Sequence, residues 1–372
     1  MSHAALLNAD SLTLEDGMLF HTKKGKARDY PSPLAPLADT HGHLTVLKSH
    51  DPALALARAA LVGVRLLVVP LDPFDDCGCT EDDPAPRRSP SDLLSFLDEA
   101  YDLAVPLMAE FADAGLVPPA FPGYEPLPLA APELPLDLRY VAGSHPYNAP
   151  YFDDEAEARM RELLAGERCV GVGEIGLDFG PYNEVDVETQ LAAFRRQLAI
   201  AHELDLPVEL HLRSSSADPD ASAHALAAQV LREMGVPAAG CDIHCFTLGP
   251  EVAEQFIELG CSIAFSGAVT FGKSDDIRAA AAKVPLDRLL SETDCPFMAP
   301  VPLRGEECEP AMVAYQAACV ADVRAEFGVS SREETYRALW NNACALFRLS
   351  YPIFDDLPSI ASRINGTRRR IA

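Results

Sequence analysis

The sequence has little that would place the protein in a membrane or carry it across one. No apolar run in the 372 residues approaches the roughly 18 residues that a membrane-spanning helix needs. The N-terminal stretch MSHAALLNADSLTLEDG lacks the basic segment followed by an apolar segment that is typical of a secretion signal. We therefore expect a cytoplasmic protein that does not bind membranes, and no feature points to an obligate protein partner.

Positive charge is also scarce. The chain has 30 Lys and Arg residues against 56 Asp and Glu residues, which gives a formal net charge of −26. This charge opposes non-specific adhesion to nucleic acid or anionic lipid. It does not exclude a nucleic-acid substrate, because a bound metal ion can provide positive charge locally.

Closely spaced cysteines occur only once among the ten cysteines of the chain, in the CGC stretch at Cys77 and Cys79. A structural zinc site needs a second pair at metal-binding spacing, and none is present. We therefore interpret the CGC stretch as a loop with two free thiols. The other cysteines are interpreted as reduced thiols, most of them buried in apolar segments.

Short apolar segments alternate with segments of helical periodicity along most of the chain. Eight of them predict strands, at 37–40, 64–70, 138–143, 170–174, 207–211, 242–245, 261–266 and 289–292. Helices are predicted at 51–61, 91–114, 154–165, 187–204, 219–234, 250–259, 274–283 and 310–327. Strands that alternate with helices pair in parallel, and eight such units favour an α/β protein with a (β/α)8 barrel. A doubly wound open sheet is the alternative.

The domain organisation follows from this pattern. Residues 1–35 are an N-terminal extension, 36–350 the barrel domain, and 351–372 a basic C-terminal tail that we interpret as solvated. Residues 72–137 are too long for a simple connection and predict an insertion after strand two. Because this insertion leaves the C-terminal end of a strand, we expect it to form a lid or wall at the active-site face.

Polar residues stand where the predicted strands end, although strands of this kind are otherwise apolar. They are His41, His43, Glu174, His211, His244 and Asp294. The C-terminal strand ends of a parallel barrel open on one face, so these side chains can converge. A single strand histidine can be an ordinary core residue, but imidazoles and carboxylates together suit divalent transition metals. A glutamate in an apolar strand is costly unless cations neutralise it, as they would if Glu174 bridged two metals.

The sequence motifs around these residues resemble those of the TatD family of metal-dependent hydrolases, within the amidohydrolase superfamily. The matching words are DTHGHL, GEIGLDF, LHLR, HCFTLGPEVAEQFIELGCSIAFSGAVTF, LLSETDCPFMAP, RGEECEP and NNACALFRL. They occur in family order and cover residues 39 to 349 apart from the insertion.

The resemblance implies a distorted TIM barrel that binds one to three divalent metals, and we expect two ions of Mg, Mn or Zn. Its ligand set would place His41, His43, Glu174 and Asp294 around one ion. The second ion would be held by Glu174, His211 and His244. The resemblance also implies catalytic roles for Glu174, as the bridge, and for Asp294, which would orient or deprotonate the attacking water.

Substrate-binding positions are implied at His145 and Arg213. Arg213 could bind a phosphate oxygen or pair with a carboxylate, and Asp178 could contact metal or substrate or only cap a loop. Arg304 could reach the mouth of the site or lie on the surface. The chain departs from the family pattern at Tyr147, Ser214 and Cys308, which concerns substrate handling more than the metal ligands.

The family implies a deoxyribonuclease, a 3′–5′ exonuclease that hydrolyses phosphodiester bonds of single-stranded DNA with metal-activated water. The same ligands also suit an amidohydrolase acting on a small amide, ester or lactone. A third alternative is a binding protein that has lost catalysis. That alternative predicts broken ligand positions, whereas all six are intact.

Overall fold

The structure is a computed structural model that describes residues 17–80, 82–83, 85–121 and 133–350. The basic tail and the first part of the N-terminal extension, which the sequence analysis set apart, lie outside the described residues. None of the described helices is long and apolar enough to cross a membrane.

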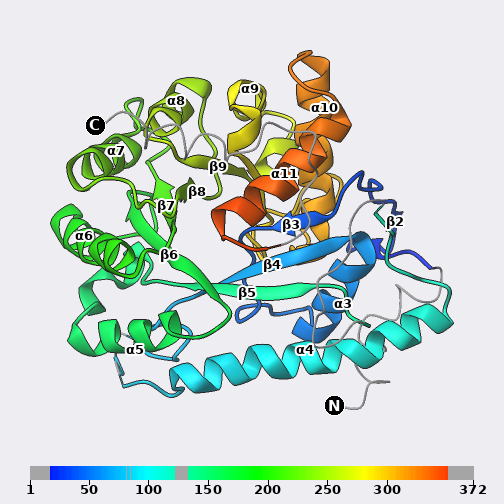
Figure 1. The fold of residues 1–372 in the computed structure, drawn as a ribbon, viewed down its shortest axis with the longest axis horizontal. Helices are drawn as coiled ribbons and strands as arrows, with labels where there is room; N and C mark the ends of the chain where they lie inside the picture. The colour runs from blue at the N-terminus through cyan, green and yellow to red at the C-terminus, as the bar shows by residue number, and fades with distance from the viewer. Residues whose placement is uncertain (1–16, 81, 84, 122–132, 351–372) are drawn as a thin grey trace, which may run out of the picture.

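Eight parallel strands form a nearly closed barrel (Figure 1). Around the sheet they follow chain order: β3 (Leu37–Asp39), β4 (Val64–Leu71), β5 (Asp137–Ala142), β6 (Cys169–Asp178), β7 (Val208–Arg213), β8 (Cys241–Ile243), β9 (Ser262–Phe265) and β10 (Leu289–Ser291). The first and last strands meet where the Thr40 N–H donates to Ser291 O at 3.2 Å, and Gly42 forms a parallel bridge with Cys295. This closure confirms the predicted barrel and excludes the doubly wound sheet.

Helices connect the strands and cover the outside of the barrel (Figure 1). They are α3 (Pro52–Val62), α4 (Pro90–Asp113), α5 (Asp154–Leu164), α6 (Val187–Leu204), α7 (Ser222–Met234), α8 (Pro250–Glu258), α9 (Asp275–Lys283), α10 (Val313–Glu326) and α11 (Arg332–Leu346). Side chains of Asp51, Ser89, Asp153, Asp186 and Ser331 cap the first turns of five of them. Such caps satisfy N–H groups that have no partner within the helix.

The core has two parts because successive residues of a strand face opposite sides. In β4, Leu67 and Val69 face the surrounding helices, whereas Leu66 and Val68 face the barrel interior. The interior residues pack with Trp340 of α11, which is fully buried. The sequence analysis did not anticipate α11, although its first turn carries a capping box formed by Ser331 and Glu334.

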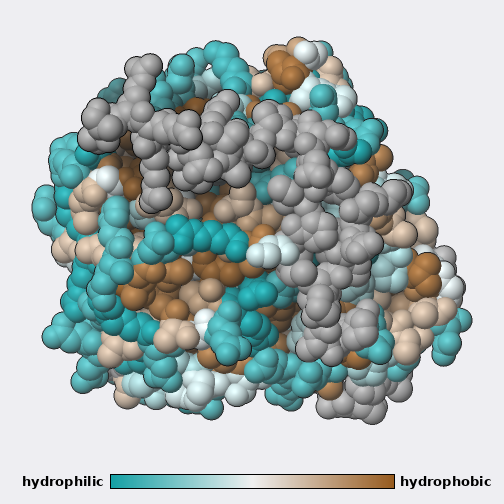
Figure 2. All heavy atoms as spheres, in the orientation of Figure 1, coloured by the Kyte–Doolittle hydropathy of each residue, from teal (hydrophilic) through white to brown (hydrophobic). Residues whose placement is uncertain are grey.

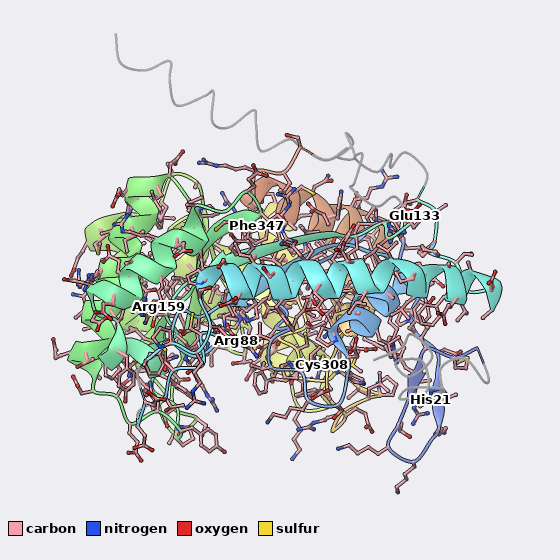
Figure 3. The ribbon with its side chains drawn as sticks, turned by 90° about the horizontal axis from the view of Figure 1, so that it is seen from below. His21, Arg88, Glu133, Arg159, Cys308 and Phe347 are labelled. Atoms are coloured by element: carbon pink, nitrogen blue, oxygen red, sulfur yellow. The ribbon has the colours of Figure 1, made fainter. Side chains whose placement is uncertain are left out.

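The helix inside the insertion is the crossover helix of the second βα unit rather than a lid. α4 buries a stripe that includes Leu93, Leu97, Ala104 and Leu107, and it packs beside α3 and α5. Figure 3 shows it lying lengthwise along one side of the molecule. The expectation of a lid is therefore wrong for this helix, because its apolar face must be buried against the barrel. The segment that reaches the histidine-bearing face begins at Asp72, whose carboxylate accepts from the His145 N–H at 2.8 Å.

The described part of the N-terminal extension is joined to the barrel domain. Strands β1 (Phe20–His21) and β2 (Ala27–Arg28) form a hairpin, and the buried ring of Phe20 packs edge-on against Tyr315. In Figure 3 this hairpin, marked by His21, lies at one end of the molecule. Figure 2 shows hydrophilic residues over much of the visible face, with smaller hydrophobic areas between them, as a strongly charged globular chain predicts.

Two buried glutamines of α6 hold the segments that lead into the histidine-bearing face. Gln197 accepts from the Ser144 N–H at 2.7 Å and donates to Ser144 O at 3.1 Å. Gln190 pairs in the same way with the backbone of Asp178, at 2.9 and 3.2 Å. The two glutamines lie two helical turns apart, so one face of α6 fixes both segments.

The substitution Gln197→Leu tests this clamp, the pair of hydrogen bonds between the Gln197 side chain and the backbone of Ser144. It leaves the buried N–H and C=O of Ser144 without partners, so we expect the free energy of unfolding to fall by about 2 kcal/mol. Urea denaturation measures the change. The control is Gln229→Leu on the exposed side of α7, where a change within about 0.5 kcal/mol is expected. Equal losses in the two variants would show that the clamp contributes nothing specific.

Candidate metal centre

All six predicted metal ligands converge at one end of the barrel. His41 and His43 follow β3, Glu174 lies within β6, His211 within β7, His244 follows β8, and Asp294 follows β10. β6 runs four residues beyond its predicted end at Glu174, so this glutamate occupies the middle of a strand and not its end. Three groups of side chains could each hold a metal ion: His41, Glu174 and His244; His41, His43 and Asp294; His145, Asp178 and His211.

The two carboxylate oxygens of Glu174 face different histidines. Oε1 lies 3.5 Å from His43 Nε2 and 3.9 Å from His41 Nε2. Oε2 lies 3.0 Å from His211 Nδ1 and 3.3 Å from His244 Nε2. One carboxylate thus separates two pairs of imidazoles, which is the arrangement of a group that bridges two cations.

The donor set fits divalent metal ions. Glu174 Oε2, His211 Nδ1 and His244 Nε2 form a triangle with sides of 3.0, 3.1 and 3.3 Å. Ligand atoms stand about 3.3 Å apart around a tetrahedral ion with bonds of about 2 Å. On the other side of Glu174, His41 Nε2 and His43 Nε2 approach to 3.1 Å. Nitrogen lone pairs repel at such distances unless a proton or a metal ion lies between them.

Burial sets the ionisation of the centre. Burial lowers the pKa of His43 to about 4 and the pKa of His145 to about 3, so both imidazoles are neutral at pH 7. Burial alone would raise the pKa of Glu174, but the surrounding histidines outweigh it and hold that pKa well below its usual value. At His211 and His244 burial again acts to lower the pKa, but hydrogen bonds to carboxylates outweigh it and raise both pKa values. Because a metal ion binds the neutral imidazole, binding at these two histidines must release a proton.

Asp294 is held by an unusual backbone conformation. Its φ is 56°, in the left-handed region that non-glycine residues rarely adopt. The Asp294 N–H donates to His41 O at 2.9 Å, and Asp294 O accepts from the Phe297 N–H at 2.9 Å. Asp294 Oδ1 thereby comes within 3.9 Å of His41 Nε2. Strained backbone maintained by surrounding bonds is typical of functional positions.

A second layer of carboxyl groups lies directly below the predicted ligands. Two residues before His211, His244 and Asp294 stand Glu209, Asp242 and Glu292, each at most 1% exposed. Glu209 Oε1 lies 2.7 Å from His41 Nδ1, and Glu292 Oε1 lies 3.7 Å from His244 Nδ1. Burial raises the pKa of Glu209 and Asp242 well above the ordinary range.

The sequence analysis missed this layer, although its signal is visible. Residues i and i+2 of a strand face the same side, so a carboxylate two positions before a ligand within one continuous strand points into the barrel beneath that ligand. A carboxylate that holds the second nitrogen of a histidine leaves the first nitrogen free to bind metal and fixes its direction. Glu209 is in this position relative to His41.

Asp178 lies beside the predicted ligands. Its Oδ2 lies 3.1 Å from His211 Nε2, and its Oδ1 accepts from the Gly180 N–H at 2.6 Å. Asp178 therefore contacts a predicted ligand and also caps the following loop. His145 lies at the same edge, with Nε2 3.8 Å from Glu174 Oε2.

The remaining positions named in the sequence analysis make contacts outside the six predicted ligands. The Arg213 guanidinium lies 5.6 Å from the centre of the Tyr182 ring and helps to lower the pKa of Asp178. Arg304 lies over the ring of Phe271 at 4.3 Å. Ser214, where the family pattern has an acid, instead contacts His224 Nδ1 at 2.9 Å. Cys308 is fully buried, outside the mouth.

The CGC stretch forms no metal site within the described residues. Cys77 and Cys79 are both free thiols and both are buried. None of the residue groups that could hold a metal ion in the described part of the chain includes either cysteine.

Comparisons with known proteins agree with this geometry. The sequence model of the family described as TatD related DNase matches residues 38–348. The chain is 36% identical over 215 residues to the uncharacterized metal-dependent hydrolase YabD of Bacillus subtilis, covering 58% of this chain and 79% of YabD. It is 36% identical over 215 residues to the 3'-5' ssDNA/RNA exonuclease TatD of Pantoea vagans, covering 56% of this chain and 78% of that protein.

A solved structure supports the same assignment. The TatD homologue YJJV of Escherichia coli K12 superposes with a TM-score of 0.60 at 26% identity, covering 84% of this chain and 98% of YJJV. A TatD family hydrolase from Entamoeba histolytica, at 16% identity and a TM-score of 0.59, shares the fold. The resemblance drawn from the sequence words is thus confirmed: the chain belongs to the TatD-related DNase family of metal-dependent hydrolases.

Proposed function

We propose that this hydrolase is a two-metal exonuclease that removes nucleotides from the 3′ end of single-stranded DNA. The observation that carries the proposal is that the two carboxylate oxygens of Glu174 face different pairs of histidines. Oε1 faces His41 and His43, and Oε2 faces His211 and His244. Two divalent ions in one hydrolytic site are typical of nucleases and phosphatases.

The ligands divide into two sets around this bridge. His41, His43, Glu174 and Asp294 would hold one ion, and Glu174, His211 and His244 would hold the other. Asp178 orients His211 through the nitrogen that points away from Glu174, and Glu209 does the same for His41. The chemistry of the donors allows Mg²⁺, Mn²⁺ or Zn²⁺.

Divalent ions in such a site make water a stronger nucleophile and stabilise the charge that develops on the phosphoryl oxygens. The protein groups supply proton transfer and position. Asp294 orients the attacking water and accepts its proton, because its carboxylate faces the histidine pair from a fixed backbone. His145 contacts the substrate from the edge of the centre, and Arg213 binds a phosphate oxygen through a charge-assisted hydrogen bond.

A single-stranded end suits this acidic chain better than a duplex does. With a net charge of −26, the protein gains nothing from a long phosphate backbone, whereas one end can reach a small local cationic centre. The exonuclease from Pantoea vagans carries a name that specifies single-stranded DNA and RNA, which supports the same substrate class here.

The net charge also favours a second candidate, an amidohydrolase that acts on a small uncharged amide, ester or lactone. Such a substrate avoids the repulsion that DNA meets. The same paired-metal ligands would serve this reaction.

Cleavage of a 5′-labelled single-stranded oligonucleotide by metal-loaded protein separates the two candidates. We expect a ladder that shortens from the 3′ end, slower cleavage of a blunt duplex, and no cleavage in excess EDTA. Glu174→Gln should reduce the rate by at least about 100-fold, because it removes the charge between the two ions. Glu188→Gln on the exposed side of α6 serves as the matched control. Intact DNA in the presence of wild-type protein that holds two metals would favour the carbonyl substrate.

Substitution of Glu209 tests the layer beneath the metals without reference to activity. Glu209→Leu removes the acceptor for His41 and should weaken divalent-metal affinity about 10–100-fold. Glu209→Gln keeps an acceptor oxygen, so its divalent-metal affinity should lie between that of Glu209→Leu and that of the wild type. Calorimetric titration of chelator-treated protein with Mn²⁺ measures both. Glu233→Gln on α7 is the control, and unchanged affinity in Glu209→Leu would remove the orienting role.

A further inference from the structure

An exposed aromatic ring lies beside the metal centre without serving the core. Tyr182, in the loop between β6 and α6, is 77% exposed, although large apolar rings are normally buried at least in part. The guanidinium of Arg213 lies over its ring at 5.6 Å, and the rest of the ring remains open to solvent. An aromatic ring next to a cation is a typical element of sites for single-stranded nucleic acid.

The side chains of Arg213 and Tyr147 link Tyr182 to the predicted ligands through direct contacts. Arg213 stands two residues after His211 on β7, so the two side chains share one face of the strand. Tyr147 interacts with both Asp178 and Arg213, and its ring packs edge-on against His145 with centroids 4.6 Å apart. A group seated on Tyr182 is therefore adjacent to the His145–Asp178–His211 edge of the centre.

A cavity of about 560 Å³ lies between Tyr147 and Tyr182. Its volume falls within the range of small-molecule sites. Glu184 and Asp186 also line it, so it is unsuited to a phosphate. Aromatic walls with nearby carboxylates suit a nucleobase, which has two stackable faces and exocyclic amino groups that donate hydrogen bonds.

We propose that Tyr182 is a base-stacking residue, and that it binds the base of a nucleotide next to the phosphate under attack while Arg213 binds that nucleotide's phosphate. The proposal rests on the proposed nuclease function and names the part of the substrate that the site recognises. Stacking on an aromatic ring accepts every base, so the structure assigns a preference for unpaired nucleotides and not for sequence.

Steady-state cleavage by metal-loaded full-length protein tests this role with two substrates. One is a single-stranded oligonucleotide with normal 3′ nucleotides, and the other carries abasic residues at its last positions. Tyr182→Ala should lower kcat/KM about tenfold on the normal substrate, mainly through KM, and leave the abasic substrate unchanged. Tyr182→Phe should behave as the wild type on both, because it keeps the ring.

The matched control is Phe327→Ala, which removes a ring of 61% exposure at the end of α10. It should change neither substrate. If the wild type cleaves DNA but Tyr182→Ala loses kcat/KM equally on both substrates, the stacking role is overturned and the nuclease proposal stands. The same holds if Tyr182→Ala loses kcat/KM on neither substrate. Absence of cleavage by the wild type overturns the nuclease proposal and this one together.

Discussion

The interaction on which the rest of the structure depends is that between Glu174 and the four histidines divided between its two oxygens. An ionised carboxylate in the middle of a barrel strand is unstable unless hydrogen bonds and nearby positive charge compensate for its lost hydration. The barrel provides this compensation by bringing strand ends from opposite sides of the sheet to one point. β3 delivers His41 and His43, whereas β7 and β8 deliver His211 and His244. Closure of the sheet between β3 and β10 is therefore a condition for the chemistry as well as for the fold.

Buried carboxyl groups also lie directly below the predicted metal ligands. Glu209, Asp242 and Glu292 are all buried in the barrel interior, and burial raises the pKa of the first two. Burial and the repulsion between neighbouring carboxylates both favour the protonated form of these groups. Some of the chain's many carboxyl groups are thus internal, where Glu209 fixes the orientation of His41, and they do not all serve solubility.

The sequence predicts most of this arrangement for identifiable reasons. The strand pattern in VELHLR or DIHCF shows both a buried segment and the polar residue at its end, so the ligand positions follow from the topology of a parallel barrel. The position of α4 does not, because a long proline-rich connection resembles a lid until the helix is seen to bury its apolar stripe against α3 and α5. The role of Asp178 depends on the tertiary distance to His211, and that of Glu209 on the tertiary distance to His41. Periodicity alone does not give those distances. The burial of Trp340 inside the barrel is not predicted by periodicity either, because packing decides which end of the barrel α11 closes.

The most direct test of the central claim is a crystal structure of the Mn²⁺-loaded protein with anomalous scattering recorded at the manganese edge. The account predicts two peaks about 3.5–4 Å apart, the usual spacing of paired catalytic metals, with one oxygen of Glu174 on each. His41 and His43 should contact one peak, and His211 and His244 the other. A single peak, or two peaks that Glu174 does not join, would contradict the account.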